Sequence, residues 1–194
     1  MKSSVLAIGI LALAASVGLA QTPVSTWTSD AAHSEVDFGI THMSISNIHG
    51  RFGNVAATIL WNEANAAKSA VSATIDVTSI DTGVAARDTH LKTDAFFDVA
   101  KFPTATFAST SATKTASGLI VKGNLTLHGV TKPVVLTVEG PTGPVPGMQD
   151  HKPHAGFTAT TTISRTAFGI GTAFPAAAVG DDVKLTIELE VVKQ

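Results

Sequence analysis

Residues 75–107, IDVTSIDTGVAARDTHLKTDAFFDVAKFPTATF, are the one place where a chain patterned like β-strands changes period, favours helix and returns to strand. At the start of this segment, apolar and polar residues alternate with the period of two that is typical of a half-buried strand. Residues 84–93 favour helix, and Asp88 and Lys92 stand at i and i+4, a pair that adds about 0.3 kcal/mol. Pro103 ends any helix, and alternation then resumes. We therefore expect one short helix that packs against a sheet and can close the end of a sheet curled on itself.

Most of the remaining chain alternates in the same way. The clearest case is residues 183–191, where Val, Leu and Ile alternate with Lys, Thr and Glu. The pattern predicts strands at residues 27–43, 52–60, 70–79, 104–111, 119–127, 134–139, 156–165 and 183–191. About eight strands at this spacing suit one antiparallel barrel or sandwich. The strand pattern thus predicts an all-β fold of about eight strands with one short helix after the third strand, and leaves a barrel and a sandwich open.

Two segments are expected to interrupt the strands. Residues 44–54 contain Gly50 and Gly53, which predict a bend that leads into the second strand. Residues 140–154 hold four of the eight prolines of the chain and are expected to form an extended loop. Neither segment predicts a domain boundary, because strand pattern resumes at once after each.

Several motifs in this order resemble the YceI family, the bacterial polyisoprenoid-binding proteins with a lipocalin-like barrel. They are W-x-x-D-x-x-H-S-x-V-x-F-x-I-x-H at residues 27–42, S-I-D-T-G, R-D-x-H-L-K and F-F-D-V-x-K-F-P within residues 79–103, G-N-L-T-L-H-G-V-T-K-P-V at residues 123–134, and I-S-R-T-A-F-G-I at residues 163–170. The resemblance covers residues 27–192. It implies an all-β fold, an antiparallel lipocalin-like barrel of about eight strands, whose partner is a long isoprenoid or other fatty-chain lipid.

Residues 1–20 have the pattern of a signal peptide. Lys2 precedes an uninterrupted apolar and small stretch, and Gly18-Leu19-Ala20 is an acceptable cleavage site. The apolar stretch is shorter than the roughly 20 residues of a membrane-spanning helix. We expect removal of residues 1–20, export of a single YceI-like lipid-binding domain at residues 21–194 to the periplasm, and no stable membrane insertion. The alternative is an uncleaved N-terminal anchor.

Composition excludes several classes of function. The chain has 13 basic and 15 acidic residues and no basic run, which argues against nucleic acid as a partner. It has no cysteine, which excludes disulfides, thiolate metal sites and cysteine nucleophiles. No catalytic or cofactor-binding motif is present, so neither an enzyme nor a cofactor is predicted. The oligomeric state is left open, with a homodimer among the alternatives.

A barrel of eight strands can be filled by its own side chains or can hold one small ligand. Here the inward residues mix bulky and small side chains, which leaves volume, and each buried CH₂ of a ligand would contribute about 0.8 kcal/mol. The alternative is a stress-related structural or interaction protein whose barrel is packed and binds no ligand. The predicted ligand-lining residues are Val36, Phe38, Ile40, His42, Phe52, Ala73, Ile75, Phe107, Leu125, Phe157, Leu185 and Ile187.

The polar candidates each have a structural alternative. His42 falls on the apolar face of its strand, where it either contacts a ligand head group or forms a hydrogen bond within the core. Arg87 and Arg165 either brace the helix and the barrel end or meet an anionic or carbonyl head group. An enzyme that acts on a bound lipid through His42 and an arginine is a further alternative. His151 and His154 flank Pro153 and have no identifiable third ligand, so no metal site is predicted.

Overall fold

The computed structural model describes residues 23–194, and the predicted signal peptide lies outside these residues. Within the described part of the chain, no helix is long and apolar enough to cross a membrane. Residues 23–194 contain ten strands, one α-helix and three single-turn 3-10 helices. The α-helix is α1 (Ala85–Leu91), and the 3-10 helices are η1 (Ala66–Lys68), η2 (Val77–Ser79) and η3 (Thr166–Phe168). The strands are β1 (Ser25–His42), β2 (Ser46–Phe52), β3 (Val55–Trp61), β4 (Ala70–Asp76), β5 (Ile80–Asp81), β6 (Thr104–Lys114), β7 (Leu119–Leu127), β8 (Val130–Pro146), β9 (Pro153–Ser164) and β10 (Val179–Lys193).

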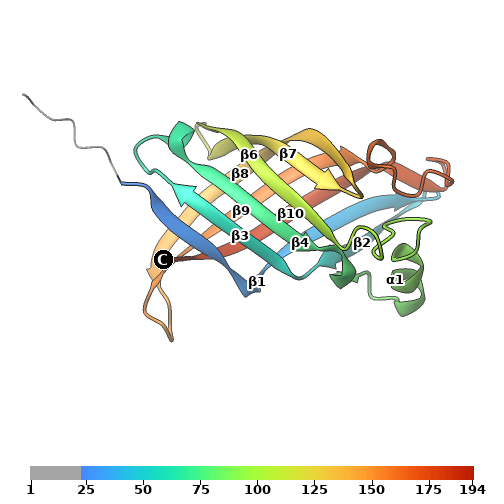
Figure 1. Ribbon diagram of the computed structural model, residues 1–194, viewed down its shortest axis with the longest axis horizontal. Helices are drawn as coiled ribbons and strands as arrows, with labels where there is room; N and C mark the ends of the chain where they lie inside the picture. The colour runs from blue at the N-terminus through green and yellow to red at the C-terminus, as the bar shows by residue number, and fades with distance from the viewer. Residues whose placement is uncertain (1–22) are drawn as a thin grey trace, which may run out of the picture.

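The strands form one antiparallel sheet that closes on itself, because β10 pairs with both β9 and β1 (Figure 1). Eight strands, β1, β3, β4 and β6 to β10, make the barrel wall. The short β2 and β5 extend the wall beside the second half of β1. This confirms the predicted antiparallel barrel, with α1 after the third of its eight wall strands.

The prediction of a bend at residues 44–54 is wrong, because β2 occupies most of this segment. β2 pairs with β1 across a three-residue turn, residues 43–45, in which Met43 and Ser44 have φ angles of 51° and 59°, and three-residue loops are among the common hairpin connections. Gly50 is needed for packing rather than for a bend. A Cβ at Gly50 would lie 2.5 Å from the ring of Phe38, so only glycine lets that ring rest on β2.

The prediction of an extended loop at residues 140–154 is also wrong. β8 continues to Pro146 and pairs with β9, so only residues 147–152 form the turn. The pairing shifts register twice, between Glu139 and Thr142 and between Thr142 and Val145. Proline lacks an N–H group, so a strand accommodates it where the ladder is already irregular. Pro141 and Pro144 therefore mark the two register shifts, whereas Pro146 and Pro153 stand at the end of β8 and the start of β9.

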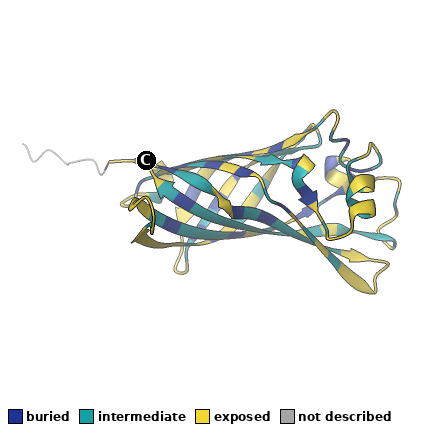
Figure 2. Ribbon diagram, turned by 90° about the horizontal axis from the view of Figure 1, so that it is seen from below, coloured by how far each residue is buried: buried dark blue, intermediate teal, exposed yellow. Residues whose placement is uncertain are grey.

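The two ends of the barrel are built differently. At the end that holds the C-terminus, Trp27, Ile59, Ala155 and Val191 form a buried cluster. At the opposite end lie α1 and the loop between η3 and β10, and Leu91 of α1 packs against two of the core clusters (Figure 2). This is the position expected for the helix. It leaves one end filled by side chains and the other covered by shorter, less regular elements.

Candidate functional site: an apolar cavity inside the barrel

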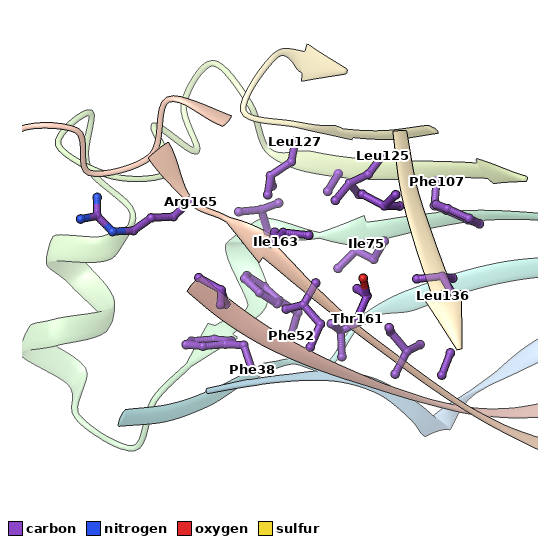
Figure 3. A pocket seen from close by; sticks show the side chains of 18 of the residues that line it. Phe38, Phe52, Ile75, Phe107, Leu125, Leu127, Leu136, Thr161, Ile163 and Arg165 are labelled. Atoms are coloured by element: carbon purple, nitrogen blue, oxygen red, sulfur yellow. The ribbon is translucent and has the colours of Figure 1, made fainter. Parts of the chain in front are cut away.

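The barrel encloses a cavity of about 820 Å³. Side chains from the inner faces of the wall strands line it, and most of them are aliphatic or aromatic (Figure 3). All twelve residues predicted to line a ligand site lie on its wall: Val36, Phe38, Ile40, His42, Phe52, Ala73, Ile75, Phe107, Leu125, Phe157, Leu185 and Ile187. Their contact with a ligand stays a prediction, whereas their common position follows from the period of two in each strand.

The inward side chains do not fill the barrel. Of the twelve, only Val36, Phe52 and Phe107 are buried, and most of the others, such as Leu185 and Ile187, remain half-buried although they face the interior. A volume of about 820 Å³ falls within the roughly 300–1,000 Å³ of small-molecule sites. The alternative of a fully packed barrel requires a solid core, and the cavity contradicts it.

Small residues on the inner face create part of this volume. Ala73, Ala105 and Ala159 line the cavity from β4, β6 and β9. Gly123 acts differently, because the ring of Phe107 occupies the place that a Cβ at position 123 would take. The largest inward ring of β6 therefore lies against the wall of the barrel instead of extending across it.

Sequence reasoning missed several lining residues. Val134, Leu136 and Val138 of β8 line the cavity, and their alternation was visible in the sequence. Phe96 and Phe174 also line it, from two loops far apart in the chain, with ring centroids 4.9 Å apart and ring planes 18° apart. No local pattern marks these two rings, because neither lies in a strand.

Apart from Ala70, the exposed lining residues gather at the end that carries α1. Thr41, His42 and Met43 reach the cavity from the end of β1, His90 from α1, and Pro175 from the loop before β10. This group defines the mouth of the cavity. The imidazole of His42 is exposed there and has no hydrogen-bond partner among residues 23–194, so the alternative of a hydrogen bond within the core is wrong.

Arg165 is a structural residue of the mouth. Its side chain is 3% exposed, and its guanidinium group donates from all five N–H groups to backbone carbonyls, those of Ile170, Gly171, Phe174, Val179 and Gly180. Since an arginine has five donors, none remains for a ligand. Arg165 therefore organises the loop between η3 and β10, and the alternative of a head-group contact is wrong for this residue.

Arg87 keeps free donors. Its Nε donates to Thr82 Oγ1 at 2.7 Å and one terminal nitrogen donates to the Thr82 carbonyl at 2.8 Å. Asp88 accepts from the Thr82 backbone N–H at 2.9 Å, so both charged residues fasten α1 to the preceding segment, which confirms the predicted bracing. The three other guanidinium N–H groups of Arg87 have no partner among residues 23–194, and the residue lies on the cavity wall.

A closed antiparallel barrel of eight strands around an apolar cavity is the architecture of the lipocalin-like class. Within this class, the chain belongs to the YceI family, because the model of the YceI-like domain matches residues 27–191. "Protein YceI" of Salmonella newport (strain SL254) is 36% identical over 197 residues and covers the whole of both chains.

Two solved structures extend the comparison. The Campylobacter jejuni YceI protein is 33% identical, with a TM-score of 0.70 over 79% of this chain and 90% of the other. A polyisoprenoid binding domain from Saccharophagus degradans, implicated in plant cell wall breakdown, is 17% identical, with a TM-score of 0.65 over 87% of this chain and 98% of the other. At that identity, the second comparison shows the shared fold alone.

Proposed function

We propose that this protein binds a long-chain isoprenoid or a similar amphiphilic lipid in the barrel cavity, and sequesters or carries it in the periplasm. The apolar cavity of about 820 Å³ is the observation that carries the proposal. The polyisoprenoid binding domain of Saccharophagus degradans, which has the same fold, supports an isoprenoid as the guest. The signal-peptide pattern of residues 1–20 supports the periplasm as the compartment.

Burial of the apolar chain supplies the affinity. At about 0.8 kcal/mol per CH₂, each fully buried five-carbon isoprene unit contributes about 4 kcal/mol. Association costs roughly 4–15 kcal/mol in lost freedom, so about four buried units offset even the upper value. Binding needs no reacting group, and no enzymatic step is proposed.

The mouth of the cavity suits a polar head group. Arg87 presents unpartnered donors there, and His42 and His90 are exposed beside it. An anionic or carbonyl head group can therefore accept hydrogen bonds at the mouth while its chain lies inside. Because Arg165 has no free donor, Arg87 is the arginine assigned to this role.

Lipid extraction and mass spectrometry of protein purified from its native host test the proposal. Ala159→Phe places a ring on the inner face of β9 and reduces the bound lipid, whereas Thr160→Phe places the same ring on the outer face one residue later and does not. Circular dichroism confirms that both variants fold. Consistently lipid-free wild-type protein contradicts the proposal, as does equal loading of the two variants.

A further inference from the structure

A second group of side chains lies outside the barrel, where β10 closes the wall against β1. Two histidines and three carboxylates gather there from segments that are far apart in the sequence. They are Asp30 and His33 of β1, Asp150 of the β8–β9 turn, His154 of β9 and Glu190 of β10, and are called the seam cluster.

The polar atoms of the seam cluster converge on His154 and Glu190. His154 Nδ1 lies 2.7 Å from Glu190 Oε1, and its Nε2 lies 3.2 Å from Asp150 Oδ1. His33 Nδ1 lies 3.2 Å from Asp30 Oδ2 and 4.0 Å from Glu190 Oε2. One ligand atom each from Asp30, His154 and Glu190 lies within 4.8 Å of the others.

The backbone places these groups by two local features. β1 leaves register with β10 between Ser29 and Ser34, and this irregularity carries Asp30 and His33. The hydroxyl of Ser34 donates to the Glu190 carbonyl at 3.1 Å and accepts from the Glu190 N–H at 3.2 Å. The backbone on both sides of the seam is therefore fixed around Glu190.

Strand register and one glycine place His154 beside Glu190. Gly156 is paired with Glu190, and His154 is paired with Val192, so His154 and Glu190 are diagonal neighbours. A Cβ at Gly147 would lie 2.6 Å from Nε2 of His154, so glycine at position 147 leaves room for the imidazole, and the His154 side chain is only 15% exposed. The position of the imidazole is thus set by the sheet and not by a mobile loop.

We propose that the seam cluster binds a divalent transition-metal ion of the Zn²⁺ type, with Asp30, His154 and Glu190 as ligands and His33 as the fourth. Imidazole and carboxylate together suit Zn²⁺, Co²⁺ and Ni²⁺, whereas Ca²⁺ and Mg²⁺ prefer oxygen ligands alone. Zinc bonds of about 2.0–2.2 Å place tetrahedral ligand atoms roughly 3.3 Å apart. The atoms of Asp30, His154 and Glu190 lie within 4.8 Å of one another, and rotations that move them by about 1–2 Å reach that spacing, while His33 is the outermost of the four and turns inward from beside Asp30.

The sequence offered only His151 and His154 as a metal pair, and a third ligand was not identifiable. In the structure, His151 is not part of the seam cluster, and the additional ligands come from β1 and β10. An ion held there joins β1 to β9 and β10 across the line where the barrel closes. The expected consequence is a metal-dependent increase in stability that is independent of any lipid.

Calorimetric titration of the tag-free chain with ZnCl₂, and absorption spectroscopy with CoCl₂, test this site. We expect one saturable equivalent of Zn²⁺, visible Co²⁺ bands from nitrogen and oxygen ligands, and an increase in melting temperature with Zn²⁺ but not with MgCl₂. His154→Ala and the closer mimic Glu190→Gln each lower the Zn²⁺ affinity by about tenfold or more. His151→Ala, in the same hairpin but outside the cluster, leaves it unchanged.

The controls make the assignment falsifiable. Absence of Zn²⁺ binding by the wild-type chain overturns it, as does equal loss of affinity in His151→Ala. Unchanged binding in a His33→Ala/His154→Ala double variant also overturns it. If His154→Ala does not fold, Glu190→Gln decides the question, because it keeps the size of the side chain and removes only the charge and one acceptor oxygen.

Discussion

Replacement of Arg165 by methionine tests whether one buried side chain holds the mouth of the barrel together. Methionine retains an unbranched apolar side chain but donates no hydrogen bond. Five backbone carbonyls between residues 170 and 180 then lose the hydrogen bond from Arg165. The substitution therefore removes the contacts of the loop with Arg165 and leaves the strands of the barrel intact.

The magnitude follows from the burial of those carbonyls. Ile170 and Gly171 are buried; the Gly171 carbonyl still accepts from the Phe174 N–H at 3.0 Å, whereas the Ile170 carbonyl is left unsatisfied, which costs about 1–3 kcal/mol. Phe174, Val179 and Gly180 are half-buried, so water partly replaces the lost donor and the cost of each is smaller. We expect Arg165→Met to lower the free energy of unfolding by about 3–5 kcal/mol, which corresponds to a fall of roughly 6–20 °C in melting temperature for a chain of this size.

Urea denaturation followed by circular dichroism measures this change. Arg165→Lys keeps the charge but has three donors instead of five, so its free energy of unfolding falls between those of the wild type and the methionine variant. Lys184→Met on the outer face of β10 is the surface control and stays within about 0.5 kcal/mol of the wild type. A loss of less than about 1 kcal/mol in Arg165→Met would refute the structural role.

Three further predictions concern the cavity wall, the mouth and acid stability. Gly123→Ala displaces the ring of Phe107 and lowers the free energy of unfolding by about 1–3 kcal/mol in urea titrations, whereas Asn124→Ala on the outer face changes it little. Arg87→Gln lowers the affinity for a fatty acid by about tenfold in a fluorescence competition assay and leaves the affinity for a long-chain alcohol unchanged. An equal loss of affinity for both would contradict the head-group role. Hydrogen bonds from Ser164 and Thr166 hold the pKa of Asp181 below its usual value, so the unfolded chain binds the proton more readily. The contribution of Asp181 to stability is therefore complete above the unfolded pKa and is lost as pH falls through the folded pKa. Asp181→Asn makes the urea midpoint fall less steeply as the pH is lowered. An unchanged dependence of the midpoint on pH would contradict this role of Asp181.

The sequence was sufficient for features that depend on period. The alternation in β1 and β10 predicted which side chains face the interior, and the lining positions of Phe38 and Leu185 follow from it. The same pattern suited a barrel or a sandwich, because two packed sheets bury their apolar faces as well as one closed sheet does. The choice of a barrel came from the resemblance to the YceI family and not from the alternation.

Features that depend on a partner strand or a distant segment were not predictable. Gly50 and the prolines of β8 are read as breaks by local rules, but pairing with β1 and β9 overrides those rules. The hydrogen bonds from all five N–H groups of the Arg165 guanidinium depend on five carbonyls in a segment without a regular sequence pattern. The seam cluster unites residues more than 100 positions apart, and only the strand register brings them together.

The two ends of the barrel differ, because side chains fill the end that holds the C-terminus and do not fill the end that carries α1. The cluster around Trp27, against which Trp61 and Phe157 pack, fills the far end, so a linear lipid bound as proposed would enter from the end that carries α1 and stop at these rings. In a homologous series of such lipids, we expect the affinity to increase with each carbon until the chain touches the rings and then to reach a plateau, because further carbons stay in water. On the proposed function, the position of the two rings would set the longest chain that the cavity buries in full.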